Sequence, residues 1–186
     1  MDGATLREMQ APLKQRYRDE PTTALTKLQA TASFDDDGIT CTVATWAGPI
    51  RAGLHPATGG DGSDACSGDM LLQALLACTG VTMRSVATAL GINIGSAKLR
   101  AQGQFDARGT LGVSRDIPVG AHDIALSVEL DTDADDEALA RLAAMTQRYC
   151  VVGQSLAQPP RLSIRRSPSP GSAAAPAVGD PPDPRT

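Results

Sequence analysis

Hydrophobic and polar positions in this chain follow two periods, one helical and one strand-like. Near the N-terminus, apolar residues recur every three or four positions, at Leu6, Met9, Leu13 and Tyr17. This spacing predicts a helical N-terminal extension over residues 1–30, broken at Pro12 and Pro21, because proline lacks the N–H that a helix interior needs.

Further along the chain, alternating and β-branched segments predict strands. These segments are residues 39–46, 50–54, 98–105, 124–130 and 161–164. Aspartate- and glycine-rich turn signals separate several of them, and the glycine-rich stretch 55–68 is predicted to be a loop.

A long apolar helix is predicted from Met70 to Leu90, with Gly91 ending it. Its apolar residues cover so much of the circumference that we expect it to be buried on most sides. Those on one face are Leu71, Leu75, Cys78, Thr82 and Ala89, and the face is widened by Leu72, Leu76 and Met83. A second helix should open at residues 135–137, where acidic side chains suit the positive end of a helix dipole, with Leu139, Leu142 and Met145 as its apolar stripe.

The order of these elements predicts an α+β fold in which an antiparallel sheet packs on helices. We place one domain at residues 31–166. Residues 167–186 are rich in Pro, Ala, Gly and Ser, and we expect them to be disordered, because they cannot bury enough apolar surface to offset the loss of chain entropy.

Composition narrows the class of protein. The 186 residues are 41% hydrophobic but only 3% aromatic, so the core must be aliphatic. A net charge of −4, without basic clusters interleaved with aromatics, argues against nucleic-acid binding. The N-terminus lacks a secretory pattern, and Gln73 and Arg84 make the longest apolar run too polar for a membrane span. We therefore expect a soluble, cytoplasmic protein without a membrane partner, whose cysteines are kept reduced.

Cys78 and Cys150 are the candidate reactive groups, 72 residues apart on two separate predicted helices. A thiol reacts as the thiolate, and a peroxide-oxidised cysteine becomes a sulfenic acid that a second cysteine condenses with as a disulfide. This chemistry also needs a group that stabilises the thiolate. Arg148 lies two residues before Cys150, and Asp69 lies at the start of the Cys78 helix.

Three segments carry a family resemblance. SGDMLLQALLACTGVTMRSVA resembles the signature helix of the OsmC/Ohr family, RYCVVGQSL resembles that family's second cysteine motif, and FDARGTLGVSRDIPVG lies between them in the expected place. The resemblance covers roughly residues 38–165. It implies an intertwined homodimer in which sheets wrap around two central helices and the active sites lie at the dimer interface.

The same resemblance implies a function. Members of the family include thiol-dependent peroxidases for organic hydroperoxides that an external dithiol reduces, without a metal or organic cofactor. By that resemblance Cys78 is the peroxidatic cysteine, Cys150 the resolving cysteine and Asp69 the family's acid.

The chain departs from the family pattern in three ways. Ala-Cys-Ser-Gly replaces a proline-containing lead-in, and the acid is Asp69 where the best-studied peroxidases have Glu. Those peroxidases also pair the acid with an arginine from an N-terminal strand and loop. Arg16, Arg18 and Arg51 are the candidates for it. Without a guanidinium, an apolar helix would raise the pKa of Cys78.

Less specific readings remain for each candidate. Either cysteine of the pair can simply fill the core, and Asp69 can be no more than a helix cap or first-turn residue. Cys41 alternates with apolar neighbours and should be core, while Cys66 is either a third redox thiol or an incidental exposed cysteine. A zinc site from His55, His122 and Cys66 lacks the usual ligand spacing. The alternative functions are an OsmC-fold binding protein with inert cysteines and a redox sensor without turnover.

Overall fold

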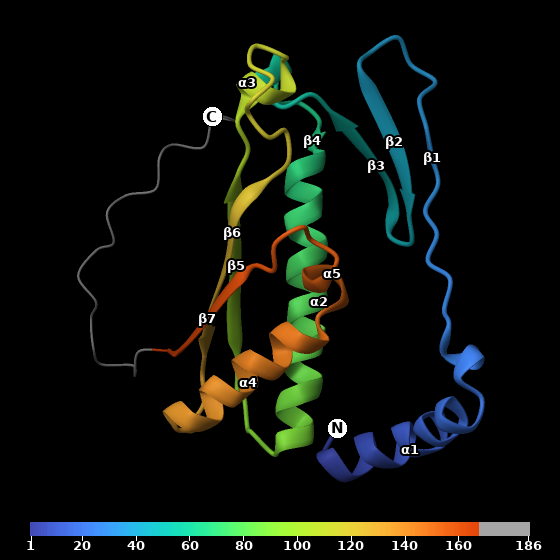
Figure 1. The fold of residues 1–186 in the computed structure, drawn as a ribbon, viewed down its shortest axis with the longest axis vertical. Helices are drawn as coiled ribbons and strands as arrows, with labels where there is room; N and C mark the ends of the chain where they lie inside the picture. Colours follow the sequence, from blue (N-terminus) through green and yellow to red (C-terminus); the bar gives the residue numbers. More distant parts are fainter. Residues whose placement is uncertain (168–186) are drawn as a thin grey trace.

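One long helix, α2 (Ser67–Leu90), runs through the centre of the fold, and two sheets lie beside it (Figure 1). The computed structural model describes residues 1–167, so the tail predicted from residue 167 onward lies, after Ser167, outside the described residues. The first sheet contains β1 (Ala32–Ser33), β2 (Thr40–Thr45), β3 (Gly48–Gly53) and β4 (Ala65–Cys66). The second contains β5 (Ala97–Gln104), β6 (His122–Leu130) and β7 (Arg161–Arg166). The predicted α+β class is confirmed.

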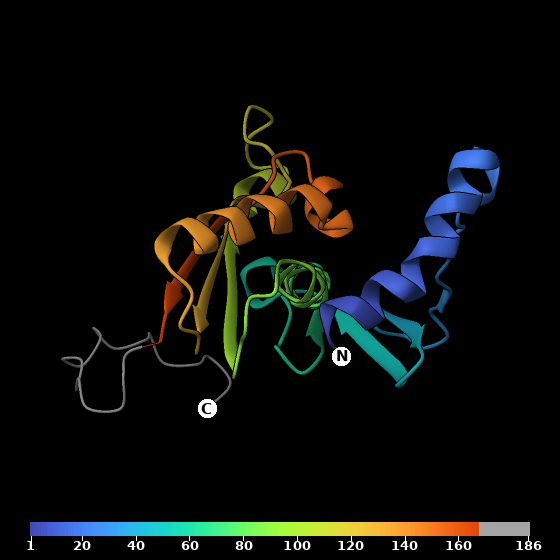
Figure 2. The same ribbon diagram turned by 90° about the horizontal axis from the view of Figure 1, so that it is seen from below.

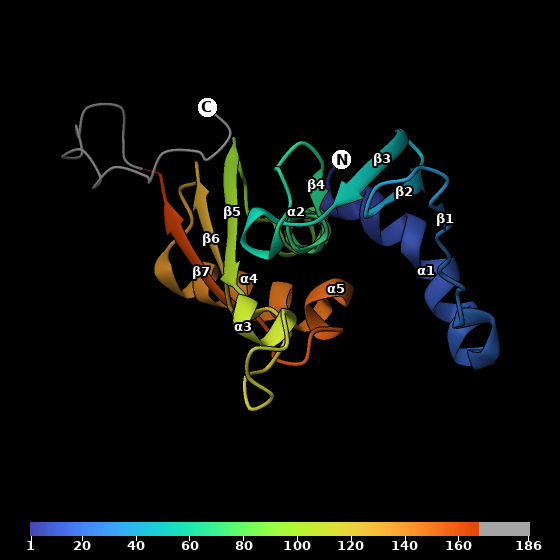
Figure 3. The ribbon, with the colours of Figure 1, turned by 90° about the horizontal axis from the view of Figure 1, so that it is seen from above.

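The remaining elements are helical. They are α1 (Gly3–Asp19), α3 (Ala107–Thr110), α4 (Asp136–Tyr149), α5 (Val151–Gln154) and the 3₁₀ turns η1 (Pro21–Ala24) and η2 (Pro56–Thr58). Viewed along α2, the second sheet and α4 lie on one side of the helix, and β1–β3 extend away on the other (Figures 2 and 3).

Local chemistry sets the ends of the two main helices. Gly91 has a φ of 73°, a left-handed conformation that glycine adopts without strain, and its N–H bonds back to the last turn of α2. Asp135 caps α4, because its carboxylate accepts a hydrogen bond of 2.8 Å from the N–H of Ala138. Both helices were predicted, although α2 begins three residues earlier than expected.

The N-terminal helix differs from its prediction. Pro12 lies inside α1 without ending it, on a helix that has no buried residue. The helix ends at Asp19 because Pro21 disfavours helical geometry at Glu20, which has a φ of −133° and a ψ of 75°. The predicted helix over residues 25–30 is wrong, since these residues are irregular.

The sheets are mixed where an antiparallel sheet was predicted. Antiparallel pairing is confirmed for β1–β2, β2–β3 and β5–β6, but β3–β4 and β6–β7 are parallel. A parallel pair needs a long connection, and α4 with α5 supplies the one between β6 and β7. Alternation along a strand reports which face is buried and not the direction of its neighbour, so the sequence pattern did not distinguish the two.

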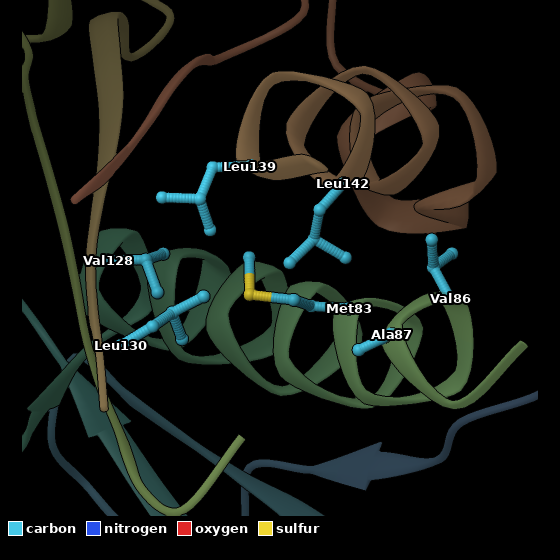
Figure 4. Packing of buried hydrophobic residues seen from close by; sticks show 7 residues of the cluster. All are labelled: Met83, Val86, Ala87, Val128, Leu130, Leu139 and Leu142. Carbon is cyan, nitrogen blue, oxygen red and sulfur yellow. The ribbon is translucent and has the colours of Figure 1, made fainter. Parts of the chain in front are cut away.

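The main core lies where α2, α4 and β6 meet (Figure 4). Its buried side chains are Met83, Val86, Ala87, Val128, Leu130, Leu139 and Leu142. In the second sheet, Leu99 pairs with Val128 and Val128 with Ile164, so neighbouring strands send apolar side chains to the same face. The stripe predicted for α4 is confirmed at Leu139 and Leu142, with Met145 packed against the cluster.

The helix α2 is buried on one face, whereas burial on most sides was predicted. It packs against α4, α5 and β5, and its buried positions are Leu75, Thr79, Met83, Val86 and Ala87. The opposite face contains Val81, which is 73% exposed. Length and apolar composition alone would let α2 cross a membrane, a test that the core helix of a soluble protein also passes.

Candidate functional site

The fold brings Cys78 and Cys150 together. Cys78 lies in the middle of α2, and Cys150 lies between α4 and α5. Both belong to one apolar cluster, in which Leu75, Leu126 and Cys150 are buried and Cys78 packs against them. The side chain of Cys150 lies close enough to Cys78 to lower the pKa of the Cys78 thiol, and both cysteines are free.

The chain holds Cys150 in place at the junction of two helices. Its N–H bonds to the carbonyl of Thr146, which ends α4, and its extended ψ of 102° redirects the chain into α5. Its Sγ accepts a hydrogen bond of 3.4 Å from the N–H of Gly153 and lies 3.5 Å from Oγ1 of Thr79 on α2. With only 3% of the residue exposed, Cys150 is held by contacts on two elements.

The surroundings of Cys78 favour its thiolate. Burial, the largest single effect, raises the pKa of Cys78, but the polar groups around the sulfur together outweigh it, so the pKa is lowered overall. In decreasing order of effect, the donors are the N–H of Val152, the thiol of Cys150, the hydroxyl of Thr82 and the N–H of Val151. All four are neutral groups. Cys78 is also half-buried and in part accessible to solvent, whereas Cys150 is buried.

Asp69 is not part of this arrangement. It lies exposed in the first turn of α2, where a carboxylate suits the positive end of the helix dipole. Nine residues of helix separate it from Cys78, which is about 13 Å at 1.5 Å per residue. Within one chain the carboxylate therefore has no contact with the thiol.

The three arginine candidates also lie elsewhere in the chain. Arg51 on β3 forms ion pairs with Asp36 and Asp64, at 3.3 Å in each case. Arg16 stacks over the ring of its neighbour Tyr17, and Arg18 donates to Gln15. Among residues 1–167 of a single chain, no guanidinium is one of the leading causes of the shift in the pKa of Cys78.

The other singled-out side chains have local roles. Arg148 is exposed and stacks over Tyr149. Cys41 is half-buried on β2, and Cys66 is half-buried at the start of α2 rather than exposed. His55 packs edge-on against Phe105. Within the described part of the chain, no three His, Cys, Asp or Glu side chains are grouped as metal ligands.

Sequence reasoning missed most of the groups that act on the two sulfurs. Thr82 was named only as part of the apolar face of α2, although its position four residues after Cys78 places it one turn along the same face. Thr79 and the backbone of residues 151–153 carried no comparable signal, because their contact with the cysteines depends on how α5 packs on α2.

The family model of the OsmC-like protein matches residues 60–165, which is more than half of the chain and includes both cysteines. The chain belongs to the OsmC-like protein family. No curated protein matches the sequence, but solved OsmC-like structures share the fold. An OsmC-like protein from Mycoplasma pneumoniae is 18% identical, with a TM-score of 0.61, and the match covers 76% of this chain and 96% of that one.

Two further solved structures give the same result. A protein of unknown function from Vibrio cholerae is 12% identical, with a TM-score of 0.63 and coverage of 76% of this chain and 100% of that one. An organic hydroperoxide resistance protein from Elizabethkingia anophelis is 14% identical, with a TM-score of 0.60 and coverage of 77% and 96%. At these identities the likeness shows the OsmC-like fold.

Proposed function

We propose that this OsmC-like protein is a two-cysteine thiol peroxidase that reduces organic hydroperoxides. The observation that carries the proposal is the packing of Cys78 and Cys150 in one apolar cluster, where the Cys150 side chain helps to lower the pKa of Cys78. A peroxidatic cysteine must be a thiolate that peroxide can reach, and its resolving partner must lie within bonding reach without competing for peroxide. Half-buried Cys78 and enclosed Cys150 meet these requirements.

In the first step, the Cys78 thiolate attacks the distal oxygen of the hydroperoxide. The O–O bond breaks, Cys78 becomes a sulfenic acid, and the alkoxide takes a proton from solvent and leaves as the alcohol. The donors from Val151, Val152 and Thr82 keep the attacking sulfur ionised before this step. The catalytic residue here is Cys78.

In the second step, Cys150 attacks the sulfur of the sulfenic acid. An S–S bond forms, the S–O bond breaks, and hydroxide leaves with the proton of the Cys150 thiol as water. An external dithiol then reduces the disulfide by thiol–disulfide exchange and restores both thiols. Neither step requires a metal or an organic cofactor.

The preference for an organic hydroperoxide rests on the apolar surroundings of the site. Leu72, Leu76 and Val152 pack against the cluster that contains Cys78 and Cys150. Such side chains suit an alkyl or aryl group better than the small, strongly hydrated hydrogen peroxide. The Elizabethkingia protein, which has the same fold, is named for organic hydroperoxide resistance.

We also propose a homodimer, with Asp69 and an arginine acting from across its interface. Val81 on the outer face of α2 is largely exposed, and Trp46 in the turn between β2 and β3 is fully exposed, and a second copy would cover such apolar side chains. Light scattering on the purified protein tests this. Twice the mass of 19.2 kDa supports it, and a monomer at micromolar concentration contradicts it.

The alternative is an OsmC-fold binding or redox-sensing protein without turnover. It is favoured by the position of Arg51, which is paired with Asp36 and Asp64 and does not act on Cys78 within the chain. The two functions differ in one measurable property: a peroxidase consumes peroxide repeatedly when dithiol is in excess, and a binding or sensing protein does not.

The deciding experiment measures consumption of cumene hydroperoxide and of hydrogen peroxide with a dithiol reductant. Wild type, Cys78→Ser and Cys150→Ser are compared. We expect activity to be lost in Cys78→Ser and a trapped Cys78 sulfenic acid in Cys150→Ser, with cumene hydroperoxide consumed faster than hydrogen peroxide by wild type. Equal, negligible rates in all three proteins would overturn the proposed peroxidase activity and favour the OsmC-fold binding protein.

A further inference from the structure

A small cavity lies directly against Cys150. Its walls include Thr79 on α2, Thr146 on α4 and Cys150 itself, and apolar side chains such as Leu126 and Leu162 complete it. The space open to the centre of a water molecule is about 10 Å³, the size that one water needs. An alkyl group or a second thiol would not fit there.

The polar groups in this cavity are buried and incompletely paired. Thr146 is 0% exposed, and its Oγ1 has no hydrogen-bond partner among the described residues. Thr79 is 1% exposed, and its Oγ1 lies 3.5 Å from Sγ of Cys150. A buried hydroxyl without a partner is unfavourable, and an ordered water normally satisfies such a group where there is room.

We propose that this cavity is a binding site for one water molecule, and that Thr79 and Thr146 are positioning residues for Cys150. The water would bond to Oγ1 of Thr146 and lie beside Oγ1 of Thr79 and Sγ of Cys150. The catalytic part of this proposal rests on the two-cysteine function proposed above, whereas the water site itself does not.

The role of the water follows from the second chemical step. In the reduced protein the Cys150 side chain acts on Cys78, but to attack the sulfenic acid the Cys150 sulfur must present a lone pair to Cys78 rather than a proton. The proton has to leave along another contact of Sγ. Among the described residues, Cys150 is the only titratable one in the cavity wall, and none of the side chains there is charged. The water accepts the thiol proton and passes one proton on, and the hydroxide that departs from Cys78 takes up one proton, so that the cavity water is restored and one water leaves for each disulfide formed.

The neighbouring amides are committed elsewhere. Nε2 of Gln147 donates to the carbonyl of Pro160, and Nε2 of Gln154 donates to the carbonyl of Gln147. The buried side-chain hydroxyls of this wall are those of Thr79 and Thr146, and Oγ1 of Thr146 is the one without a partner among the described residues.

The first test uses Thr146→Val, which removes the hydroxyl at nearly constant shape, with Thr146→Ser as the matched control. A crystal structure of the reduced wild type is expected to show a water within hydrogen-bond distance of Oγ1 of Thr146, and Thr146→Val should lose it. The midpoint of urea unfolding should fall in Thr146→Val, whereas Thr146→Ser keeps the hydroxyl and its water and should lose only the burial of one methyl group. If no water satisfied the Thr146 hydroxyl, removing that hydroxyl would raise the stability instead. A cavity without water and a Thr146→Val variant more stable than wild type would therefore overturn the proposal.

The second test separates the two chemical steps by stopped flow. In Thr146→Val, sulfenic acid formation with cumene hydroperoxide should keep the wild-type rate. Disulfide formation should slow about five- to tenfold, the effect of one lost hydrogen bond, with a shifted pH profile that Thr146→Ser restores. An unchanged second step and pH profile would overturn the positioning role.

A further experiment tests the role of the water even if the proposed peroxidase activity is wrong. If wild type does not react with hydroperoxides, diamide can oxidise the same pair. The Cys78 thiolate adds to the diazene, and Cys150 displaces the resulting hydrazine as the disulfide forms. The rate of that displacement in wild type, Thr146→Val and Thr146→Ser then decides the role of the water independently.

Discussion

The hydroxyl of Thr79 lies 3.5 Å from the sulfur of Cys150, so that two buried residues 71 positions apart join the central helix α2 to the end of α4. The same sulfur accepts the N–H of Gly153, which closes the first turn of α5. Cys150 is therefore a structural link as well as a candidate resolving thiol, and variants at this position report on both properties.

Cys150 substitutions should separate packing from chemistry. Cys150→Ala removes the acceptor of the Gly153 N–H in a buried site and should lower the free energy of unfolding by about 1–3 kcal/mol. Cys150→Ser keeps an acceptor and should lose less. Urea unfolding of the reduced proteins measures the difference, and equal stability of the two variants would show that the hydrogen bonds to Sγ contribute little.

Thr82 should tune the reactivity of Cys78. Its hydroxyl lowers the pKa of the Cys78 thiol, so Thr82→Val should raise that pKa and slow alkylation by iodoacetamide at neutral pH by about fivefold, the effect of one hydrogen bond. The pH profile of alkylation in a Cys41→Ser/Cys66→Ser background gives the measurement. Thr82→Ser keeps the hydroxyl and should give the same profile as the Cys41→Ser/Cys66→Ser background. An unchanged profile in Thr82→Val would show that Thr82 does not influence Cys78.

Leu142 should carry a large share of core stability. It is fully buried between α4 and α2, and Leu142→Ala should lower the free energy of unfolding by about 2–5 kcal/mol through lost burial and the cavity left behind. Leu111 is mostly exposed, so Leu111→Ala should change stability by less than about 0.5 kcal/mol. Thermal and urea unfolding of the two variants test this prediction. Similar decreases in the free energy of unfolding of Leu142→Ala and Leu111→Ala would contradict this assignment of the core.

Asp106 should titrate at unusually low pH. Hydrogen bonds from the Arg108 side chain and backbone N–H, with the charge of Arg108, lower the pKa of Asp106 to about 2. Because the folded pKa lies below the ordinary value of 3.8, its contribution to stability is present above about pH 4 and is lost as the pH falls toward 2. NMR titration of the carboxyl carbon in wild type and Arg108→Gln measures this. A midpoint near 3.8 in wild type would contradict it.

The sequence by itself determined the elements whose chemistry is local. The helix over Met70–Leu90 follows from apolar periodicity, and Gly91 ends it because glycine reaches the left-handed conformation without strain. The start of α4 follows from the carboxylate of Asp135. Two cysteines within family-like segments were also enough to indicate the OsmC-like family and to select Cys78 and Cys150.

Only the tertiary structure decided which groups meet. Strand alternation does not encode direction, so the parallel pairing of β6 and β7 appeared only once α4 and α5 had returned the chain. The packing of α5 on α2 brought Cys150 and the backbone N–H groups of residues 151–152 to Cys78, while helical rise kept Asp69 about 13 Å away. A hydrogen bond depends on positions within tenths of an ångström, and positions 70 residues apart in sequence are fixed only by the packing of the whole fold.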